Sequence, residues 1–254
     1  MIIDAFPFYN ELDLVEKRIQ YLDDSVDFFL ICESDHTYMR KQKPLFFQEN
    51  LERFAAYKNK IILKPYIVDV NAPYVKGWDY EADQRNFLGN FIESNFAKDD
   101  VILFSDADEI PNKDRFDEIV EKLKSVDLVT LEQETFFMNL NYREVGLCYR
   151  ARALKTNILK RANVFDLRFN LGPDNLVQKA GWHLSYFFSL ETMIKKVESY
   201  SHDEYNNSHF KDPDRIKKCI EQRVFPFAMN HRPLEIPDPS MFTDEFLQHF
   251  DSYR

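Results

Sequence analysis

Apolar runs of strand length alternate with helix-like patterns from the first residue as far as Pro111. Four runs are short and bounded by polar turns, as is typical of buried strands, and they lie at residues 1–6, 26–33, 60–68 and 101–104. Between them, apolar side chains recur at helical spacing, and helices are expected at residues 12–22, 45–57 and 78–96. The alternation predicts an α/β fold with a largely parallel nucleotide-binding half.

The second half of the chain is less regular. Its elements are expected as a helix, a strand, an apolar segment and a helix at residues 112–124, 127–133, 180–187 and 189–200. Basic side chains outnumber acidic ones between the strand and the apolar segment. Such a bias marks a solvated face, or a groove in which Arg150, Arg152 and Arg161 bind an anionic group.

The apolar run at residues 101–104 leads directly into three carboxylates, Asp106, Asp108 and Glu109. Side chains two apart on an extended segment point the same way, about 6.6 Å apart along the chain, so Asp106 and Asp108 can face one point. Because α/β proteins bind ligands at the carboxyl ends of their strands, this pair predicts a site for a divalent cation with a nucleotide. The structural alternative is that Asp108 and Glu109 cap the next helix, with Pro111 in its first turn.

Charge, motifs and cysteine spacing exclude several other functions. The net charge is −10, whereas a nucleic-acid binder needs a basic face. The 5 glycines form neither a dinucleotide fingerprint nor a P-loop, so a metal held by carboxylates is the natural way to bind a diphosphate. The 3 cysteines form no disulfide framework or zinc motif, which fits a reducing compartment. No apolar run reaches the length of about 20 residues that a membrane helix needs, and no signal peptide is evident, so we expect a soluble, cytoplasmic protein.

Several short motifs occur in an order that resembles glycosyltransferase family 17. The resemblance spans about residues 1–205 and rests on Phe6-Pro7-Phe8-Tyr9-Asn10-Glu11-Leu12-Asp13-Leu14, Glu33-Ser34, Gln84-Arg85-Asn86, Ser105-Asp106-Ala107-Asp108-Glu109-Ile110-Pro111 and Ala180-Gly181-Trp182-His183. It implies an A-type glycosyltransferase fold, with a Rossmann-like nucleotide-binding half and a mixed central sheet flanked by helices. It also implies a UDP-sugar donor (above all UDP-GlcNAc), a divalent cation (Mn²⁺ or Mg²⁺) and inversion at the anomeric carbon. The animal members carry an N-terminal membrane anchor that is not seen in this sequence, so a short form is expected and glycan, glycolipid and glycoprotein acceptors all stay open.

The same resemblance assigns roles to particular residues. Asp106 would lie near the ribose or the metal, Asp108 would be the principal metal ligand, and His183 would be a third ligand or contact the diphosphate. Contacts with the donor would come from Pro7, Asn10, Glu11, Glu33, Arg85, Asn86, Ser105 and Asp106. A single domain over 1–254 would hold a nucleotide-sugar-binding half, an acceptor half and a C-terminal wrapping segment at 1–111, 112–205 and 206–254.

An inverting transfer also needs a carboxylate base that takes the proton of the acceptor hydroxyl while UDP leaves from the opposite face. The first candidate is Glu191, and the others are Glu132, Glu134 and Asp174; His183 is the second candidate catalytic residue. Glu191 can equally be a first-turn acid that complements a helix dipole. The same carboxylates would also suit a metal-dependent phosphoesterase or pyrophosphatase, or an inactive carbohydrate-binding module of the same fold.

Overall fold

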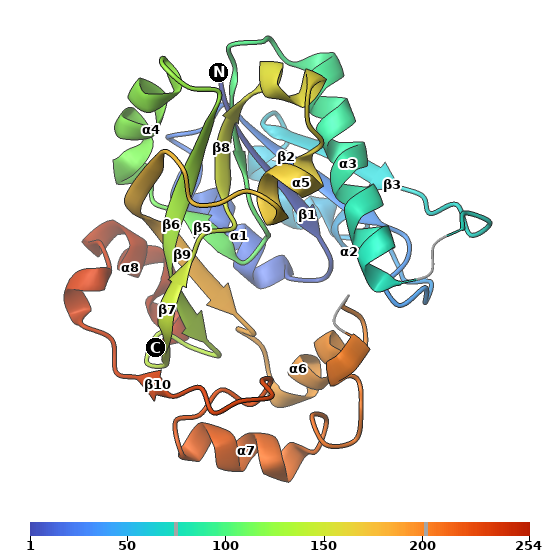
Figure 1. The fold of residues 1–254 in the computed structure, drawn as a ribbon, viewed down its shortest axis with the longest axis vertical. Helices are drawn as coiled ribbons and strands as arrows, with labels where there is room; N and C mark the ends of the chain where they lie inside the picture. Colours follow the sequence, from blue (N-terminus) through green and yellow to red (C-terminus); the bar gives the residue numbers. More distant parts are fainter. Residues whose placement is uncertain (74–75, 201–202) are drawn as a thin grey trace.

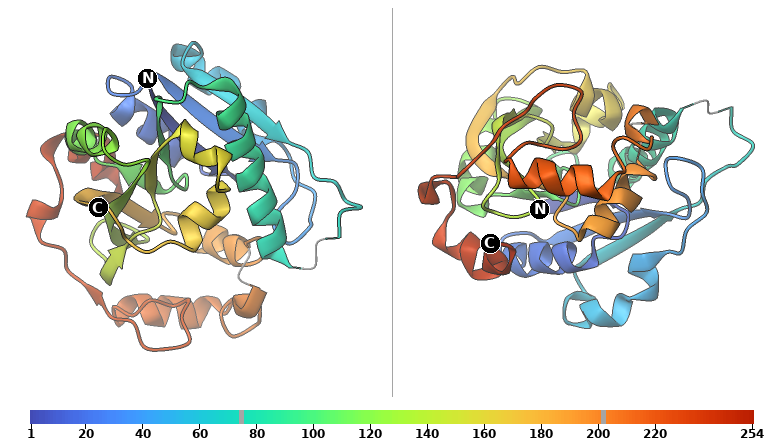
Figure 2. Two further views of the ribbon diagram at one scale, coloured as in Figure 1. Left: turned by 45° about the horizontal axis from the view of Figure 1, so that its top comes forward. Right: turned by 90° about the horizontal axis from the view of Figure 1, so that it is seen from below.

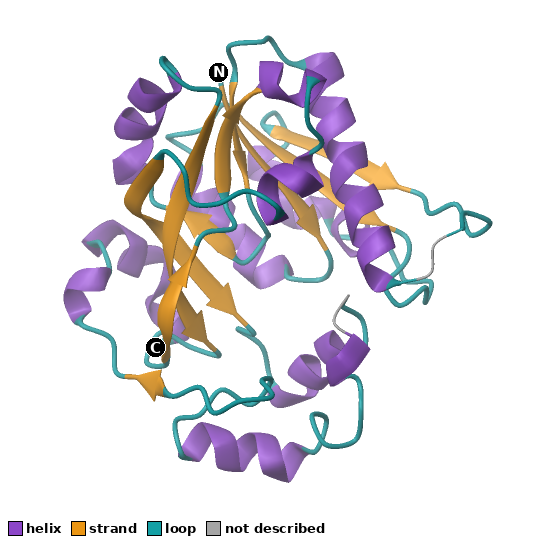
Figure 3. Ribbon diagram, in the orientation of Figure 1, coloured by secondary structure: helices purple, strands orange, loops and turns teal. Residues whose placement is uncertain are grey.

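In the computed structural model, which describes residues 1–73, 76–200 and 203–254, a mixed sheet forms the centre of the molecule. Its strands run in the order β10-β7-β6-β8-β4-β1-β2-β3, and β9 pairs with both β6 and β5 (Figure 1, Figure 3). The strands are β1 (Ile2–Phe8), β2 (Phe28–Ser34), β3 (Ile61–Tyr66), β4 (Val101–Phe104), β5 (Glu109–Pro111), β6 (Leu128–Phe137), β7 (Arg143–Cys148), β8 (Arg152–Lys155), β9 (Leu176–Ser185) and β10 (Leu234–Glu235). The helices are α1 (Leu12–Leu22), α2 (Phe46–Glu49), α3 (Gly77–Asn95), α4 (Phe116–Leu123), α5 (Val164–Phe169), α6 (Leu190–Val197), α7 (Pro213–Glu221) and α8 (Asp244–Phe250).

The first half of the chain forms the parallel part of the sheet, as predicted. Strands β4, β1, β2 and β3 are all parallel to their neighbours in that order. Their carboxyl ends therefore lie along one edge, where β1 and β2 end at Phe8 and Ser34. The second half adds antiparallel strands on the other side of β4. The predicted mixed sheet flanked by helices is confirmed.

Alternating side chains of the sheet build a separate hydrophobic core on each face. Phe6, Phe29 and Leu103 pack with α1, α4 and α8 on one face. Ala5 and Leu30, together with other side chains of the opposite parity, pack with α3 and α5 on the other face. Figure 2 shows α4 and α8 on one side of the strands and α3 on the other. The period of two residues is what allows one continuous apolar strand to serve both cores.

The segment after Asp108 is a strand and does not begin a helix. Residues Glu109–Pro111 form β5, which pairs with β9 so that Glu109 lies opposite His183. The capping alternative is therefore wrong for Asp108 and Glu109, because α4 starts only at Phe116. The pairing matters for function, because it places the segment with Asp106, Asp108 and Glu109 beside the segment with His183.

Gly181 is required by the close approach of β9 to β5. A Cβ atom there would collide with the carbonyl oxygen of Ile110 and lie 3.2 Å from Cα of Pro111. We expect Gly181→Ala to lower the free energy of unfolding by about 1–3 kcal/mol, the usual cost of overpacking a buried site. Urea denaturation measures this. Gly172→Ala is the matched control, because a Cβ there meets nothing within 4 Å, and equal stability of the two variants would contradict the explanation.

The C-terminal segment packs against both the first helix and the end of the sheet. Tyr21 of α1 contacts the rings of Phe246 and Phe250 in α8, and Trp182 stacks on Phe246 with ring centroids 4.0 Å apart. Helix α6 begins after Ser189, whose side chain caps it, and lies with α7 beyond the ends of the strands (Figure 1). Within the described ranges, no helix is both long enough and apolar enough to cross a membrane.

Candidate active site

A cavity of about 590 Å³ opens at the edge of the sheet where the parallel strands end. Its walls come from the ends of β1 and β2, from α3, from the loop between β4 and β5, and from β9 and α6. Aromatic side chains such as Tyr38, Trp78 and Phe169 line it together with several charged groups. The volume is within the range of small-molecule sites, and the place is where parallel α/β sheets bind ligands.

Asp106 lies between two buried arginines in the wall of this cavity. Its Oδ1 is 2.7 Å from Nη2 of Arg85, and its Oδ2 is 2.6 Å from Nη2 of Arg168. Burial alone would raise the pKa of Asp106, but the charges of Arg168 and Arg85 hold that pKa well below the usual range. The arginines also bind acids, with Arg85 2.9 Å from Glu81 and Arg168 2.8 Å from Glu109. Both oxygens of Asp106 are therefore occupied by cations of the protein itself.

Asp108 lines the same cavity and has different partners. Its Oδ2 accepts a hydrogen bond from Nζ of Lys196 at 3.0 Å, and its Oδ1 lies 3.7 Å from Nε2 of His183. Burial would raise the pKa of Asp108, but Lys196 and His183 lower it, so the carboxylate is ionised. For His183, burial would lower the pKa, whereas the Cys148 side chain and the charge of Asp108 raise it to about 10.

The loop that carries these carboxylates is held in place by Arg18 of α1. Its Nη1 donates to the carbonyl oxygens of residues 106, 107 and 109 at 2.6, 3.2 and 3.0 Å. Its Nε and Nη2 bind both oxygens of Asp4 at 2.8 and 2.6 Å, and Nη2 also reaches Oγ of Ser105 at 2.7 Å. Arg18 is not among the residues predicted from the sequence, although the sequence carries a signal for it. Arg18 lies three residues after Val15 on the apolar stripe of α1, where a charge needs a buried partner.

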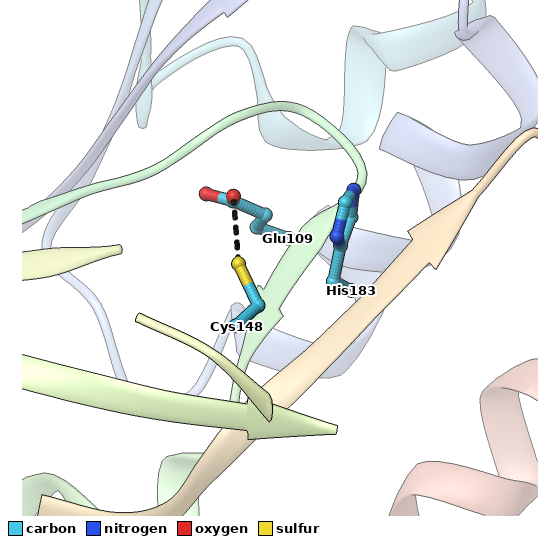
Figure 4. Close-up of side chains that lie close together, drawn as sticks. All are labelled: Glu109, Cys148 and His183. Carbon is cyan, nitrogen blue, oxygen red and sulfur yellow. Dashed lines mark hydrogen bonds between the residues drawn. The ribbon is translucent and has the colours of Figure 1, made fainter. Parts of the chain in front are cut away.

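Glu109, Cys148 and His183 come together from β5, β7 and β9 (Figure 4). One ligand atom from each lies within 4.8 Å of the others, and the Sγ of Cys148 donates to Oε1 of Glu109 at 3.8 Å. Arg168 already donates to both oxygens of Glu109 at 2.8 Å. Since that carboxylate is neutralised, the group is better described as a packed wall of the cavity than as a metal centre.

Several residues predicted from the sequence line the cavity, namely Pro7, Glu11, Arg85, Asp106, Asp108 and His183. They come from β1, the turn before α1, α3, the β4–β5 loop and β9, most of which are far apart in the sequence. The parallel strands and the β5–β9 pair bring them to one edge.

The other predicted donor-binding residues lie outside the cavity lining. The carboxylate of Glu33 is fully buried and accepts hydrogen bonds from two N–H groups of α2 at 2.9 and 3.1 Å. Asn86 accepts from the N–H of Phe165 and so joins α3 to α5. The hydroxyl of Ser105 is buried beneath Arg18, and Asn10 is part of the turn before α1. These side chains support the elements around the cavity.

The acids considered as bases also lie away from this cavity. Glu191 has a side chain that is 78% exposed and pairs with Lys195. It lies in the first turn of α6, as expected for an acid that complements the helix dipole. Glu132 accepts a hydrogen bond from the N–H of Lys179, and Glu134 pairs with Arg143 on the same face of β6. Asp174 is exposed in the segment before β9. The structure brings none of these four acids to the cavity wall that it describes.

The three arginines of the basic stretch have separate surroundings. Arg152 is 1% exposed and donates to backbone carbonyls around the end of α5. Arg161 pairs with Asp127 on the surface. Arg150 is exposed, lies over the ring of Phe169 and lines the cavity. Of the three, Arg150 is the one that can reach a ligand there.

Comparisons with known proteins identify the relatives of this chain. The family model described as "Glycosyltransferase family 17" matches residues 1–229. The proteins named β-1,4-mannosyl-glycoprotein 4-β-N-acetylglucosaminyltransferase from Rattus norvegicus and Homo sapiens are each 34% identical to it over 120 residues. The match covers 44% of this chain and 22% of each relative, so the chain matches a minor part of their length.

Among solved structures, S. aureus TarS (1–349) is similar with a TM-score of 0.43 and 12% identity, covering 98% of this chain and 80% of that chain. The glucosyl-3-phosphoglycerate synthase of M. tuberculosis gives a TM-score of 0.40 and 14% identity, covering 92% of this chain and 90% of that chain. The family assignment rests on the sequence match, which runs from the first strand to beyond α7. This chain belongs to glycosyltransferase family 17.

Proposed function

We propose that this glycosyltransferase moves N-acetylglucosamine from UDP-GlcNAc to a hydroxyl of a glycan, glycolipid or glycoprotein, with inversion at the anomeric carbon and with bound Mn²⁺ or Mg²⁺. The family match supports glycosyl transfer, and the relatives at 34% identity bear the name of an N-acetylglucosaminyltransferase. The observation that carries the proposal is the position of Asp108 and His183 together in the cavity at the strand ends.

The pair formed by Asp108 and His183 fits a divalent cation. Oδ1 of Asp108 and Nε2 of His183 are 3.7 Å apart, and one ion at about 2.0–2.2 Å from each can touch both atoms. A carboxylate oxygen and an imidazole nitrogen are ordinary ligands for Mn²⁺, and His183 would lose its Nε2 proton on binding the cation. Asp106 is a poorer direct ligand, because Arg85 and Arg168 take its two oxygens. When bound, the cation would stabilise the negative charge that develops on the leaving diphosphate.

Two positive side chains support the donor in this proposal. Nζ of Lys196 lies 3.0 Å from Asp108 and over the ring of Tyr186, so it can donate to a phosphate oxygen beside that carboxylate. Arg85 has a buried Nη1 atom with no hydrogen-bond acceptor among the described residues. An unpaired guanidinium N–H in the wall of a cavity is costly unless a ligand accepts from it. The turn from Pro7 to Glu11 would hold the uridine.

A ligand panel tests the donor and the cation together. UDP-GlcNAc, UDP-Glc, UDP-Gal and GDP-Man are each added with Mn²⁺ or with EDTA while thermal unfolding is followed. A ligand at about 100 times its dissociation constant adds about 2.7 kcal/mol, which raises Tm by roughly 5–10 °C for a chain of this size. We expect the largest shift with UDP-GlcNAc and Mn²⁺, lost with EDTA. No shift with any nucleotide sugar would refute the donor and favour an inactive module.

Cys148 offers a second test of where the substrates bind. Its side chain lines the cavity beside His183 and is partly exposed. Alkylation by N-ethylmaleimide adds a bulky group to this wall, so we expect the rate of sugar transfer to fall at least about tenfold, by loss of a near-attack geometry. UDP-GlcNAc with Mn²⁺ should protect the thiol. The residual rate and the modified peptide are measured together.

The control for this test is Cys148→Ser. Cys32 is buried and Cys219 lies in α7, away from the cavity lining, so the variant should stay active and resist the reagent. Equal sensitivity of the parent and of Cys148→Ser would contradict the assignment.

A further inference from the structure

A second cavity of about 710 Å³ adjoins the first. The two share a wall that includes Cys148, Arg168 and His183. The second cavity is lined by β6, β7, β9 and the segment that carries Phe225 and Arg232. A ligand in the second cavity would therefore meet a ligand in the first beside His183. Such contiguous cavities are what a reaction between two bound substrates requires.

The pairing of β6 with β7 and with β9 brings Glu144 and His183 to the second cavity. Thr135 of β6 lies opposite His183 of β9, and Gln133 of β6 lies opposite Cys148 of β7. Arg143 of β7 lies opposite Phe136 of β6, so Glu144 directly follows and Thr135 directly precedes this pair, and both line the second cavity. Neighbouring strands are about 4.8 Å apart, which places Glu144 and His183, two strands apart, at about 10 Å.

Glu144 is a buried acid in a mostly basic cavity. The residue is 6% exposed, and its carboxylate is ion-paired with Arg232. In the part of the chain that the structure describes, Glu144 is the sole carboxylate lining the second cavity. Burial raises the pKa of Glu144, while the charges of Arg232 and His183 act against this rise. A base for use near neutral pH benefits from a raised pKa of this kind.

The carboxylates that line the first cavity already have other partners. Glu81, Asp106 and Glu109 are ion-paired with buried arginines, whereas the side chain of Arg232, which pairs with Glu144, is 45% exposed. The carboxylate of Glu11 accepts hydrogen bonds from two N–H groups of its own turn, and Asp108 is the proposed ligand of the cation. Among the acids that line the two described cavities, this leaves Glu144 for an acceptor hydroxyl.

We propose that the second cavity binds the acceptor and that Glu144 is the catalytic base of the transfer. The proposal rests on the proposed function, because it assigns the partner substrate of the same site. The acceptor oxygen forms a bond to the anomeric carbon, and its proton passes to the Glu144 carboxylate. The bond from that carbon to the phosphate oxygen breaks, and its electron pair leaves with UDP. Arg232 holds the carboxylate in position, while Tyr149, Phe169 and Phe225 offer faces for a sugar ring.

Glu144→Gln tests the proposal, because it keeps the shape of the side chain and removes its ability to take a proton. UDP release from UDP-GlcNAc with Mn²⁺ is measured with water alone and with p-nitrophenyl glycosides of mannose, glucose, galactose and N-acetylglucosamine. Loss of a general base lowers kcat by about 10²–10⁴-fold. The thermal shift by UDP-GlcNAc should equal that of the parent. Glu235→Gln, an exposed acid on the neighbouring strand β10, is the control and should keep kcat.

The outcomes separate the acceptor role from the donor site. A kcat of Glu144→Gln within about threefold of the parent overturns the proposal, and so does loss of its donor shift. If this variant fails to fold, Glu144→Asp tests the proposal instead. Aspartate keeps the negative charge, but its side chain is one methylene shorter, so the carboxylate lies farther from the acceptor. We expect a kcat at least tenfold lower with an unchanged donor shift, and an unchanged kcat overturns the proposal. A parent protein with neither donor shift nor UDP release refutes the proposed function, and the role of Glu144 with it.

Discussion

Asp108→Asn is expected to lower kcat/KM for sugar transfer by about 10³-fold, equal to about 4 kcal/mol of transition-state stabilisation. The amide keeps the shape of the side chain and removes the negative charge that now faces Lys196 at 3.0 Å and His183 at 3.7 Å. A neutral amide binds a divalent cation far more weakly than a carboxylate does. The measurement is the initial rate of UDP release from UDP-GlcNAc over a titration of Mn²⁺.

The matched control for Asp108→Asn is Asp99→Asn. Asp99 is an exposed acid in the turn before β4, so its charge lies outside the cavity lining. Its variant should keep the parental rate and the parental Mn²⁺ dependence. If Asp108→Asn also kept that dependence, the carboxylate would not be a metal ligand and the proposed cation site would be refuted.

Arg18→Met is expected to lower the free energy of unfolding by about 3–5 kcal/mol, the cost of removing one partner of a buried ion pair. The side chains of Arg18 and Asp4 are both 0% exposed and lie 2.6 Å apart. Methionine leaves the Asp4 carboxylate without its cation and removes the donor to three carbonyl groups of the 106–109 loop. Urea denaturation followed by tryptophan fluorescence measures the change.

Two further variants show whether the buried charge is the cause. Arg53→Met removes an arginine that pairs with Glu16 and Asp13 at the surface, where such pairs contribute at most about 1 kcal/mol. Replacing Arg18 and Asp4 together by Met and Leu should recover part of the lost stability, because no unpaired charge remains buried. Equal losses for Arg18→Met and Arg53→Met would contradict this explanation.

The parallel half of the fold could be predicted because its signals are local. Continuous apolar runs that end in polar turns mark β1, β2, β3 and β4, and the stripe between them marks α1. The β5 strand could not be read in this way. Its three residues are too few to show the alternation or apolar run that predicts a strand. They form a strand only because β9 supplies the hydrogen bonds. The same pairing explains why a capping interpretation of Asp108 and Glu109 failed.

The candidate site likewise has features that follow from local sequence and features that depend on tertiary packing. The sequence by itself determined which residue types end the buried strands, and therefore that Asp106 and Asp108 lie at the ligand edge of the sheet. Only the tertiary structure decided the partners of those carboxylates, because Arg168 and Lys196 come from segments far along the chain. The structure also shows that the buried carboxylate of Glu33 accepts a hydrogen bond from an N–H group of α2, and that Glu144 lines the second cavity. Periodicity fixes which way a side chain points along its own element, whereas the neighbours it meets depend on how distant elements pack.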